Sequence, residues 1–258
     1  MKLRAYVFAA LVAVLAMFNG AASAVQVGVW QFDNNLTNAL PGGGPMVVNG
    51  SWSAAYSAAT IAGNPATVLS FPKFNDTQSL QMPNQAVAPT NIWSIVMDVN
   101  FPSVTGFSSL WQTDQNINAN DGDFFINNGG IGISSSYHGA VAAGAWTRIA
   151  VTLQPSGATY ELKKYIDGLL VGTTTSGTSP NGRHSVGAVL NLFADEDDET
   201  GAGLVNSVAY YDNLLSAEDV RLLGSATAGG VPAVPEPSTL ALGGLAVAGL
   251  LAARRRKR

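Results

Sequence analysis

The chain has 258 residues, enough to bury a hydrophobic core without crosslinks, and it contains no cysteine and only two histidines. Disulfides, thiolate metal sites and cysteine nucleophiles are therefore excluded, and a zinc site built on histidine is disfavoured. Seven of the 13 basic residues lie at positions 2, 4 and 254–258, so six remain between the ends, against 16 acidic residues when Glu236 is set aside. The resulting charge of about −10 argues against nucleic acid and anionic membranes as partners.

Residues 1–24 have the features of a secretory signal peptide. A basic start, MKLR, precedes the apolar stretch Tyr6–Phe18, and Ala22-Ser23-Ala24 supplies the small residues that signal peptidase accepts. An N-terminal anchor helix is the alternative, but the apolar run is short and ends in a cleavage site. We therefore expect signal peptidase to remove residues 1–24 as a cleaved signal helix during export across the inner membrane.

From Val25 onward, short apolar runs alternate with polar residues and are separated by Gly, Asn, Pro and Ser. Such spacing, with almost no helical periodicity, predicts an all-β fold: an antiparallel sandwich or barrel. Three tryptophans, Trp30, Trp93 and Trp146, lie within strand patterns and are predicted to be core residues. The ten predicted strands are residues 25–32, 66–71, 91–101, 107–112, 123–127, 146–154, 159–166, 169–173, 188–195 and 203–211.

Two local features are more specific. Asp167-Gly168 separates two strand-like runs, and this pair tolerates the positive φ angles of a type I′ hairpin turn. Ser216 stands before two acidic residues and an apolar run, which predicts a helix N-cap, and Gly224 is placed to end that helix. We therefore expect one tight hairpin and one short helix after the last strand.

The predicted domain covers residues 25–225. Residues 226–233, ATAGGVPA, are small and uncharged, which is typical of a flexible linker. Residues 234–258 form a separate tail, which consists of a proline-rich motif at 234–239, an apolar span at 240–253 and a basic block at 254–258.

The 14-residue apolar span reaches about 21 Å as a helix, short of the ~30 Å hydrocarbon core of a bilayer. Flanking residues and snorkelling arginines would extend it to a marginal membrane-spanning helix, with the basic block on the cytoplasmic side. A permanently anchored tail is therefore one interpretation.

The order of motif, span and basic block resembles the PEP-CTERM sorting signal of Gram-negative bacteria, with Val234, Pro235, Glu236 and Pro237 as the sorting motif. In that family a membrane protease, exosortase, recognises Pro-Glu-Pro and releases the body from its tail. The resemblance implies a protein that is held at the membrane for a time and then passes to the cell surface or the extracellular matrix. The prolines keep the recognition segment extended and outside the following helix.

The body resembles the laminin-G-like, concanavalin A-like jelly roll. The resemblance depends on residues 28–33 (GVWQFD), on the stretch from Trp146 to Gly168 that ends in YIDG, and on residues 192–201 and 208–216. The order and spacing of these stretches extend the resemblance over residues 27–224, although the region after Asp33 departs from the family's pattern. The resemblance implies a jelly-roll sandwich of the kind that binds sugars, proteins or calcium, and of which some members are glycosidases.

Catalysis is not expected. Members of this fold that cut glucans carry E-x-D-x-x-E, and the pattern that begins at Glu196 continues with Asp198 but has Gly201 where the second glutamate is required. A G-x-S-x-G signature is also missing, and His138 and His184 lie in no recognisable triad. We therefore predict a protein that is not an enzyme.

Five consecutive acids, residues 195–199, repel one another, and calcium with its six to eight oxygen ligands would relieve that repulsion. A solvated acidic loop is the equal alternative, and EF-hand spacing is absent. Any calcium site must therefore be assembled from separate loops. The candidate calcium ligands are Asp195, Asp197 and Glu199, with Asp121 and Asp123 as a second group and Asp33 as a third.

Sugar binding needs exposed aromatic rings, and Trp52, Tyr56 and Tyr137 lie in polar sequence where they could stack on a sugar or cap the sandwich. The sequence thus predicts an exported surface or matrix protein that binds glycan or another surface ligand, with calcium as its only candidate cofactor. The expected partners are signal peptidase, an exosortase-type protease and extracellular polysaccharide, with no nucleic acid. A structural component of a biofilm matrix is the first alternative, and a glycoside hydrolase is the second.

Overall fold

A computed structural model describes residues 26–41, 43–83, 91–113, 122–176 and 184–232. The predicted signal peptide, sorting motif, apolar span and basic block lie outside these residues, as does Asp121. Within the described part of the chain, no helix has the length and apolar character needed to cross a membrane.

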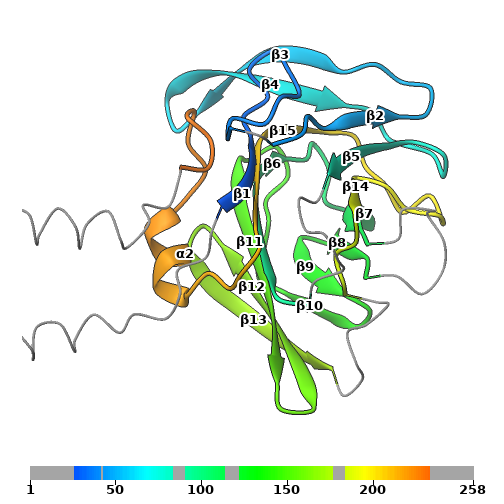
Figure 1. Ribbon diagram of the computed structural model, residues 1–258. Coiled ribbons are helices and arrows are strands. Elements are labelled where there is room, and N and C mark those ends of the chain that lie inside the picture. Colours follow the sequence, from blue (N-terminus) through cyan, green and yellow to red (C-terminus); the bar gives the residue numbers. More distant parts are fainter. Residues whose placement is uncertain (1–25, 42, 84–90, 114–121, 177–183, 233–258) are drawn as a thin grey trace, which may run out of the picture. The chain divides into compact units, whose positions relative to one another are not determined.

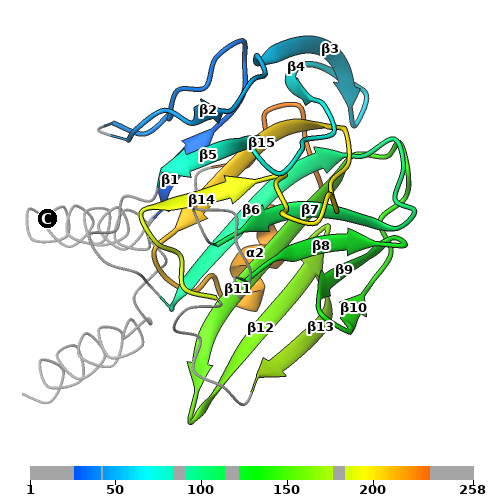
Figure 2. The same cartoon turned by 90° about the vertical axis from the view of Figure 1, so that its right-hand side faces the viewer.

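The described residues form two antiparallel sheets that pack face to face as a jelly-roll-like sandwich (Figures 1 and 2). Sheet A has the order β13-β12-β11-β6-β15-β4-β3, and β1 also pairs with β15. Its strands are β1 (Gln26–Trp30), β3 (Ala55–Ile61), β4 (Asn64–Phe71), β6 (Trp93–Asn100), β11 (Thr147–Ser156), β12 (Thr159–Ile166), β13 (Leu169–Ser176) and β15 (Gly203–Tyr211).

Sheet B has the order β10-β9-β8-β7-β14-β5-β2, and each neighbouring pair is antiparallel. Its strands are β2 (Val47–Asn49), β5 (Ser79–Pro83), β7 (Phe107–Gln112), β8 (Phe124–Asn127), β9 (Gly130–Ile133), β10 (Ser136–His138) and β14 (Val189–Leu192). The predicted antiparallel sandwich is thus confirmed for the described residues.

Each of the ten predicted strands overlaps an observed strand, but five further strands of the described residues were missed. Strands β2, β5, β9 and β10 have only three to five residues, too few for a period-2 pattern to stand out, and β9 is glycine-rich (GIGI). Strand β3 is longer, but its sequence AYSAATI is small and mostly exposed, so the apolar alternation is absent.

The core lies between the sheets, where alternate residues of each strand point inward. Trp30 and Trp93 are buried there, as predicted, whereas Trp146 is only half-buried against a smaller cluster around Ile61 and Val68. Trp146 lies one residue before β11 begins at Thr147, so the strand's alternation does not direct it into the main core.

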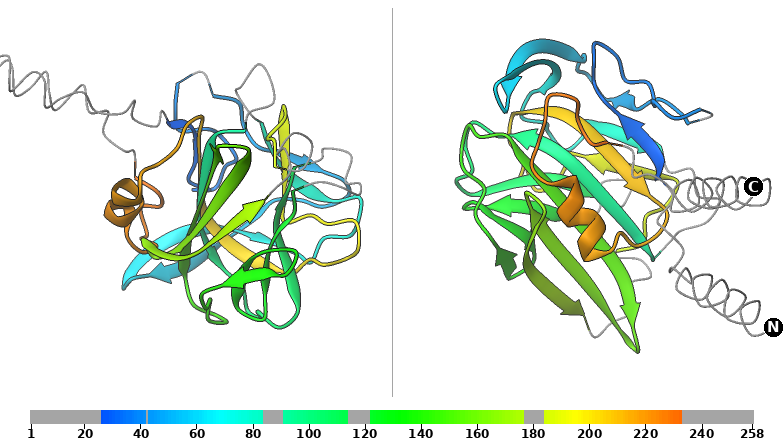
Figure 3. Two further views of the ribbon diagram at one scale, coloured as in Figure 1. Left: turned by 90° about the horizontal axis from the view of Figure 1, so that it is seen from below. Right: turned by 90° about the vertical axis from the view of Figure 1, so that its left-hand side faces the viewer.

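The predicted hairpin and helix are both present. Asp167 and Gly168 have φ angles of 51° and 82° between β12 and β13, as a type I′ turn requires. Helix α2 (Ala217–Leu223) begins after Ser216, whose side chain accepts a hydrogen bond from the Asp219 amide, and it ends at Gly224. Figure 3 shows this helix lying over the outer face of sheet A, on which Val220 and Leu223 are buried.

The segment after α2 is part of the folded body and is not a free linker over residues 226–232. Val231 is fully buried, and its amide donates to Ser207 Oγ at 2.9 Å. Asn206 donates to the Thr227 carbonyl at 2.9 Å, which also ties this segment to β15. The small, uncharged composition that suggested flexibility instead allows the backbone to pack closely on the sheet.

Candidate functional site

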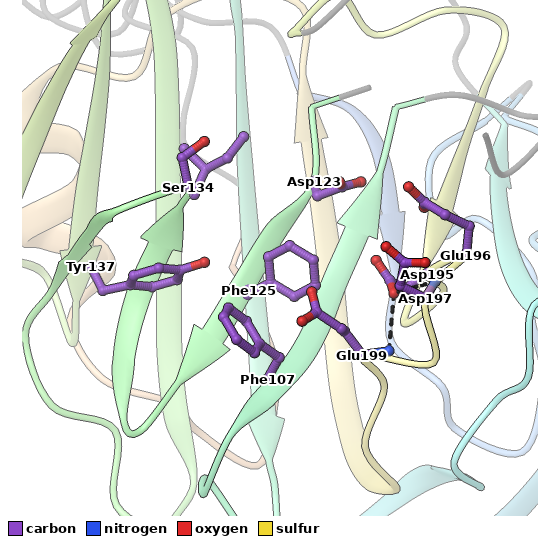
Figure 4. Close-up of a pocket in the computed structure, with 10 residues that line it drawn as sticks. Phe107, Asp123, Phe125, Ser134, Tyr137, Asp195, Glu196, Asp197 and Glu199 are labelled. Carbon is purple, nitrogen blue, oxygen red and sulfur yellow. Dashed lines mark hydrogen bonds between the residues drawn. The ribbon is translucent and has the colours of Figure 1, made fainter. Parts of the chain in front are cut away.

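A depression of about 230 Å³ lies over the outer face of sheet B, near the end where β8 begins and β14 ends (Figure 4). Phe124 and Ile126 of β8 point into the core, so Phe125 between them points to the opposite face and lines this depression. We call it the acidic pocket. Aromatic side chains line one half of it, and carboxylates line the other.

The aromatic half is formed by Phe107 of β7, Phe125 of β8 and Tyr137 of β10. The Phe107 ring makes edge contacts with both others, at centroid distances of 5.5 Å to Phe125 and 6.0 Å to Tyr137. Burial raises the pKa of Tyr137 to about 12, with smaller contributions from the negative charges of Glu199 and Asp123. The Tyr137 hydroxyl therefore stays protonated and can donate a hydrogen bond at neutral pH.

Strand β10 reaches this position because Gly132 of β9 has no side chain. Gly132 pairs with both Phe125 and Tyr137, and a Cβ atom there would overlap the Ser136 carbonyl oxygen. The buried Lys164 of β12 connects sheet A to β10, because its ammonium group donates a hydrogen bond of 2.8 Å to the Ser136 carbonyl. Burial lowers the pKa of Lys164 to about 8.

Four of the five carboxylates in the acidic half come from the loop after β14, and the fifth, Asp123, directly precedes β8. Asp195 is buried, and its Oδ2 accepts hydrogen bonds from the amides of Asp197 and Glu199 at 2.9 and 3.0 Å, which closes the loop (Figure 4). The Glu199 carbonyl accepts from the Ser109 amide at 2.8 Å, which ties the loop to β7. Burial raises the pKa of Asp195 despite these hydrogen bonds, and Asp197 and Asp198 raise it further.

Three carboxylates of this half are close enough to share a cation. Asp123, Asp195 and Glu196 each offer an oxygen within 4.8 Å of the other two. Gln112 is fully buried beside them: its amide nitrogen donates to Glu196 Oε2, while its Oε1 accepts no hydrogen bond from the described residues. Carboxylate and amide oxygens are the ligands that calcium prefers, so this donor set fits the ion.

The structure brings together five of the nine predicted ligand residues that belong to the body. Asp123, Asp195, Asp197, Glu199 and Tyr137 all line the acidic pocket, although they come from three separate segments. Figure 4 shows their side chains converging from β8, β10 and the loop after β14.

The other described candidates lie away from the pocket. Trp52 packs on Phe74 at a centroid distance of 4.7 Å, and its indole donates to two backbone carbonyls, so it caps the sandwich. Tyr56 is half-buried against the core from β3, and Asp33 is exposed. None of these three lines the acidic pocket.

Sequence reasoning missed Phe107, Phe125 and Gln112, which were interpreted only as strand residues. A signal for one of them was present: Phe124 and Phe125 are adjacent in a strand, so one ring must face away from the core. Glu196 was recognised in the acidic run but was not among the predicted calcium ligands.

Two-layer jelly rolls of this kind include lectin domains. The family model of the concanavalin A-like lectin/glucanases superfamily, Laminin_G_3, matches residues 74–221, and the chain belongs to this family. The PEP-CTERM protein-sorting motif matches residues 233–257. Such motifs mark proteins for export and surface display and imply processing by exosortase, a membrane protease.

Solved structures share the fold at low sequence identity. Domain 4 of AbnA, an extracellular arabinanase of Geobacillus stearothermophilus solved with arabinotriose, matches at 18% identity and a TM-score of 0.55, over 78% of this chain and 99% of that domain. The receptor-binding domain of botulinum neurotoxin type G matches at 12% identity and a TM-score of 0.53, over 78% of this chain and 50% of its own length. The binding domain of Paraclostridial mosquitocidal protein 1 matches at 10% identity and a TM-score of 0.53, over 77% and 51%. No curated protein matches the sequence.

Proposed function

We propose that the jelly-roll domain binds a glycan in the acidic pocket, at the cell surface or in the extracellular matrix, and does so without catalysis. The observation that carries this proposal is the convergence of Phe107, Phe125 and Tyr137 with several carboxylates in one depression. Ring faces pack against the C–H faces of a sugar, while carboxylates accept hydrogen bonds from its hydroxyl groups. The arabinanase domain solved with arabinotriose supports a saccharide as the ligand class.

The termini supply the setting for this function. A signal peptide removed by signal peptidase would direct the body outward, and the sorting motif would present the tail to exosortase before release. Extracellular polysaccharide is then the material that surrounds the mature protein. The net charge of the body argues against nucleic acid as a competing ligand.

The expected result of a glycan-binding test is that a Phe107→Ala variant loses affinity for its glycan about tenfold, or about 1.4 kcal/mol. Calorimetric titration of the ligand found on a glycan array measures this loss. Leu170→Ala is the matched control, because it removes a comparably exposed apolar side chain from β13. The glycan should also be recovered without new reducing ends.

Three outcomes contradict the proposal. An array with no bound glycan would favour a structural matrix component, and release of reducing ends that Glu196→Gln abolishes would favour the hydrolase. Equal binding by the Phe107→Ala variant and the control would move the binding site elsewhere on the domain.

Calcium is proposed as a resident ion of the carboxylate half, held by Asp123, Asp195 and Glu196 with the Gln112 carbonyl as a neutral ligand. This rests on the 4.8 Å grouping and on the buried Gln112 oxygen that receives no donor from the described residues. An ion there would join β8 to the loop after β14 and would reduce the repulsion among residues 195–199.

Calcium is therefore expected to stabilise the protein by about 2–3 kcal/mol at a concentration near 100 times its dissociation constant. Thermal unfolding with calcium and with chelator measures the difference. Glu196→Gln should abolish most of this stabilisation, whereas the exposed Asp76→Asn variant should retain it. Equal melting temperatures with calcium and with chelator would eliminate the calcium site and leave the glycan proposal intact.

A further inference from the structure

The acidic pocket has an excess of negative charge that no basic side chain of the described residues balances. Five carboxylates line it, and no lysine or arginine among the described residues does so. Lys73 is exposed, and the other described basic residues are engaged elsewhere: Arg148 with Asp98, Lys163 with Glu161, Arg221 with Glu218, and Lys164 with Ser136 and Thr174. A positively charged ligand would therefore meet no repelling lysine or arginine side chain among the described residues of the pocket.

One calcium ion does not remove this excess. The proposed calcium ion carries two positive charges, whereas the pocket has five carboxylates. Asp197 and Glu199 are not among the proposed calcium ligands, so their carboxylates remain available to a second cation. Figure 4 shows the Glu199 carboxylate directed toward the rings of Phe107 and Phe125, with the Tyr137 hydroxyl facing the same space. An ammonium group placed there would contact ring faces and a carboxylate together, which combines a cation–π interaction with a charge-assisted hydrogen bond.

A buried acceptor points the same way. Ser109 of β7 is fully buried, and its Oγ has no hydrogen-bond partner among the described residues. Ser109 pairs with Phe125, so its side chain is on the pocket face of the sheet, and its amide holds the Glu199 carbonyl. The pocket thus has more acceptors than donors, and an ammonium brings three N–H donors.

The dimensions of the pocket favour a sugar as the carrier of that charge. At about 230 Å³ the depression is smaller than the pockets that hold drug-sized ligands, and its size suits a single sugar residue. Phe107, Phe125 and Tyr137 extend across β7, β8 and β10, so that a ring can lie on them while its amino group reaches Glu199.

We infer that the preferred ligand is a glycan with free amino groups, such as a partly deacetylated amino-sugar polymer; this inference rests on the proposed glycan-binding function. Neutral and N-acetylated sugars offer the same C–H faces but no positive charge, so they should bind more weakly. The sorting of the protein to the cell exterior would bring it to such polymers.

The test is calorimetric titration of the protein with equal-length oligomers of glucosamine, N-acetylglucosamine and glucose at fixed calcium. The glucosamine oligomer should bind at least tenfold more tightly than the other two, and the difference should shrink as salt is added. Glu199→Gln should abolish the preference while weak binding of the glucose oligomer persists. Glu161→Gln, which removes an exposed carboxylate from β12, should retain the preference.

The alternative outcomes separate this inference from the proposed function. Equal affinity for the three oligomers would overturn the charge preference and leave glycan binding in place. Failure to bind any oligosaccharide would overturn both. Tighter binding of an oligolysine peptide than of the glucosamine oligomer would identify a basic protein as the partner and would overturn the amino-sugar inference.

Discussion

Replacement of Arg148 by methionine is expected to lower the free energy of unfolding by about 4 kcal/mol. Arg148 is 1% exposed, and its guanidinium donates two hydrogen bonds of 2.7 Å to the Asp98 carboxylate. It also donates to the carbonyls of Leu223 and Gly230, while Ser207 donates to Asp98. Removal of the cation leaves the buried Asp98 carboxylate without its counter-ion and takes one donor from each of the two backbone carbonyls.

The position of the pair explains why one residue has so large an effect. Arg148, Asp98 and Ser207 are register partners on β11, β6 and β15, in the centre of sheet A. The two carbonyls belong to the end of α2 and to the segment after it. Loss of Arg148 therefore loosens the C-terminal segment from the sheet as well as breaking the ion pair.

Urea unfolding of the variants measures this effect. Lys163→Met, which removes a partly exposed cation from the Lys163–Glu161 pair, should change stability by less than about 0.5 kcal/mol. The double variant Arg148→Met with Asp98→Leu should lose less than the sum of the single variants, because it leaves no unpaired buried charge. A loss below 1 kcal/mol for Arg148→Met would show that the buried pair does not hold the segment.

Local patterns in the sequence predicted local features of the fold well. Asp167-Gly168 specified its turn because both residues tolerate a positive φ, and Ser216 specified the start of α2 through its side-chain hydrogen bond. The hydrogen bond from Arg148 that helps to hold residues 226–232 on the sheet could not be predicted in this way, because Arg148 lies about eighty positions earlier in the chain. The residues adjacent to Arg148 in the sequence do not indicate that its side chain is buried or which distant carbonyls it contacts.

The acidic half of the pocket was predictable in part because its loop residues are adjacent in the chain. The addition of Asp123 depends on strand pairing: Trp111 of β7 pairs with Phe124 on one side and Leu192 on the other. This register brings the start of β8 and the end of β14 to the same end of the sheet. No property of the separate segments sets that register, and the aromatic half depends on it in the same way.

Gly132→Ala is expected to have the second large effect, a loss of about 2 kcal/mol in stability and of at least tenfold in glycan affinity. The new Cβ would overlap the Ser136 carbonyl oxygen and would lie 2.8 Å from the Ser136 carbonyl carbon and 2.9 Å from the Tyr137 Cα. These are backbone atoms that no rotamer change can displace, so β10 itself must move away from β9.

Movement of β10 removes Tyr137 from its edge contact with Phe107 and withdraws the Ser136 carbonyl from Lys164, so binding and stability should fall together. Calorimetric titration and urea unfolding of the same preparation measure the two losses. Gly229→Ala is the control, because a Cβ there meets no described atom within 4 Å, and it should bind and unfold like the unaltered protein. A Gly132→Ala protein with full glycan affinity would show that the ligand does not contact Tyr137, and the aromatic half would then have to be reassigned to Phe107 and Phe125 alone.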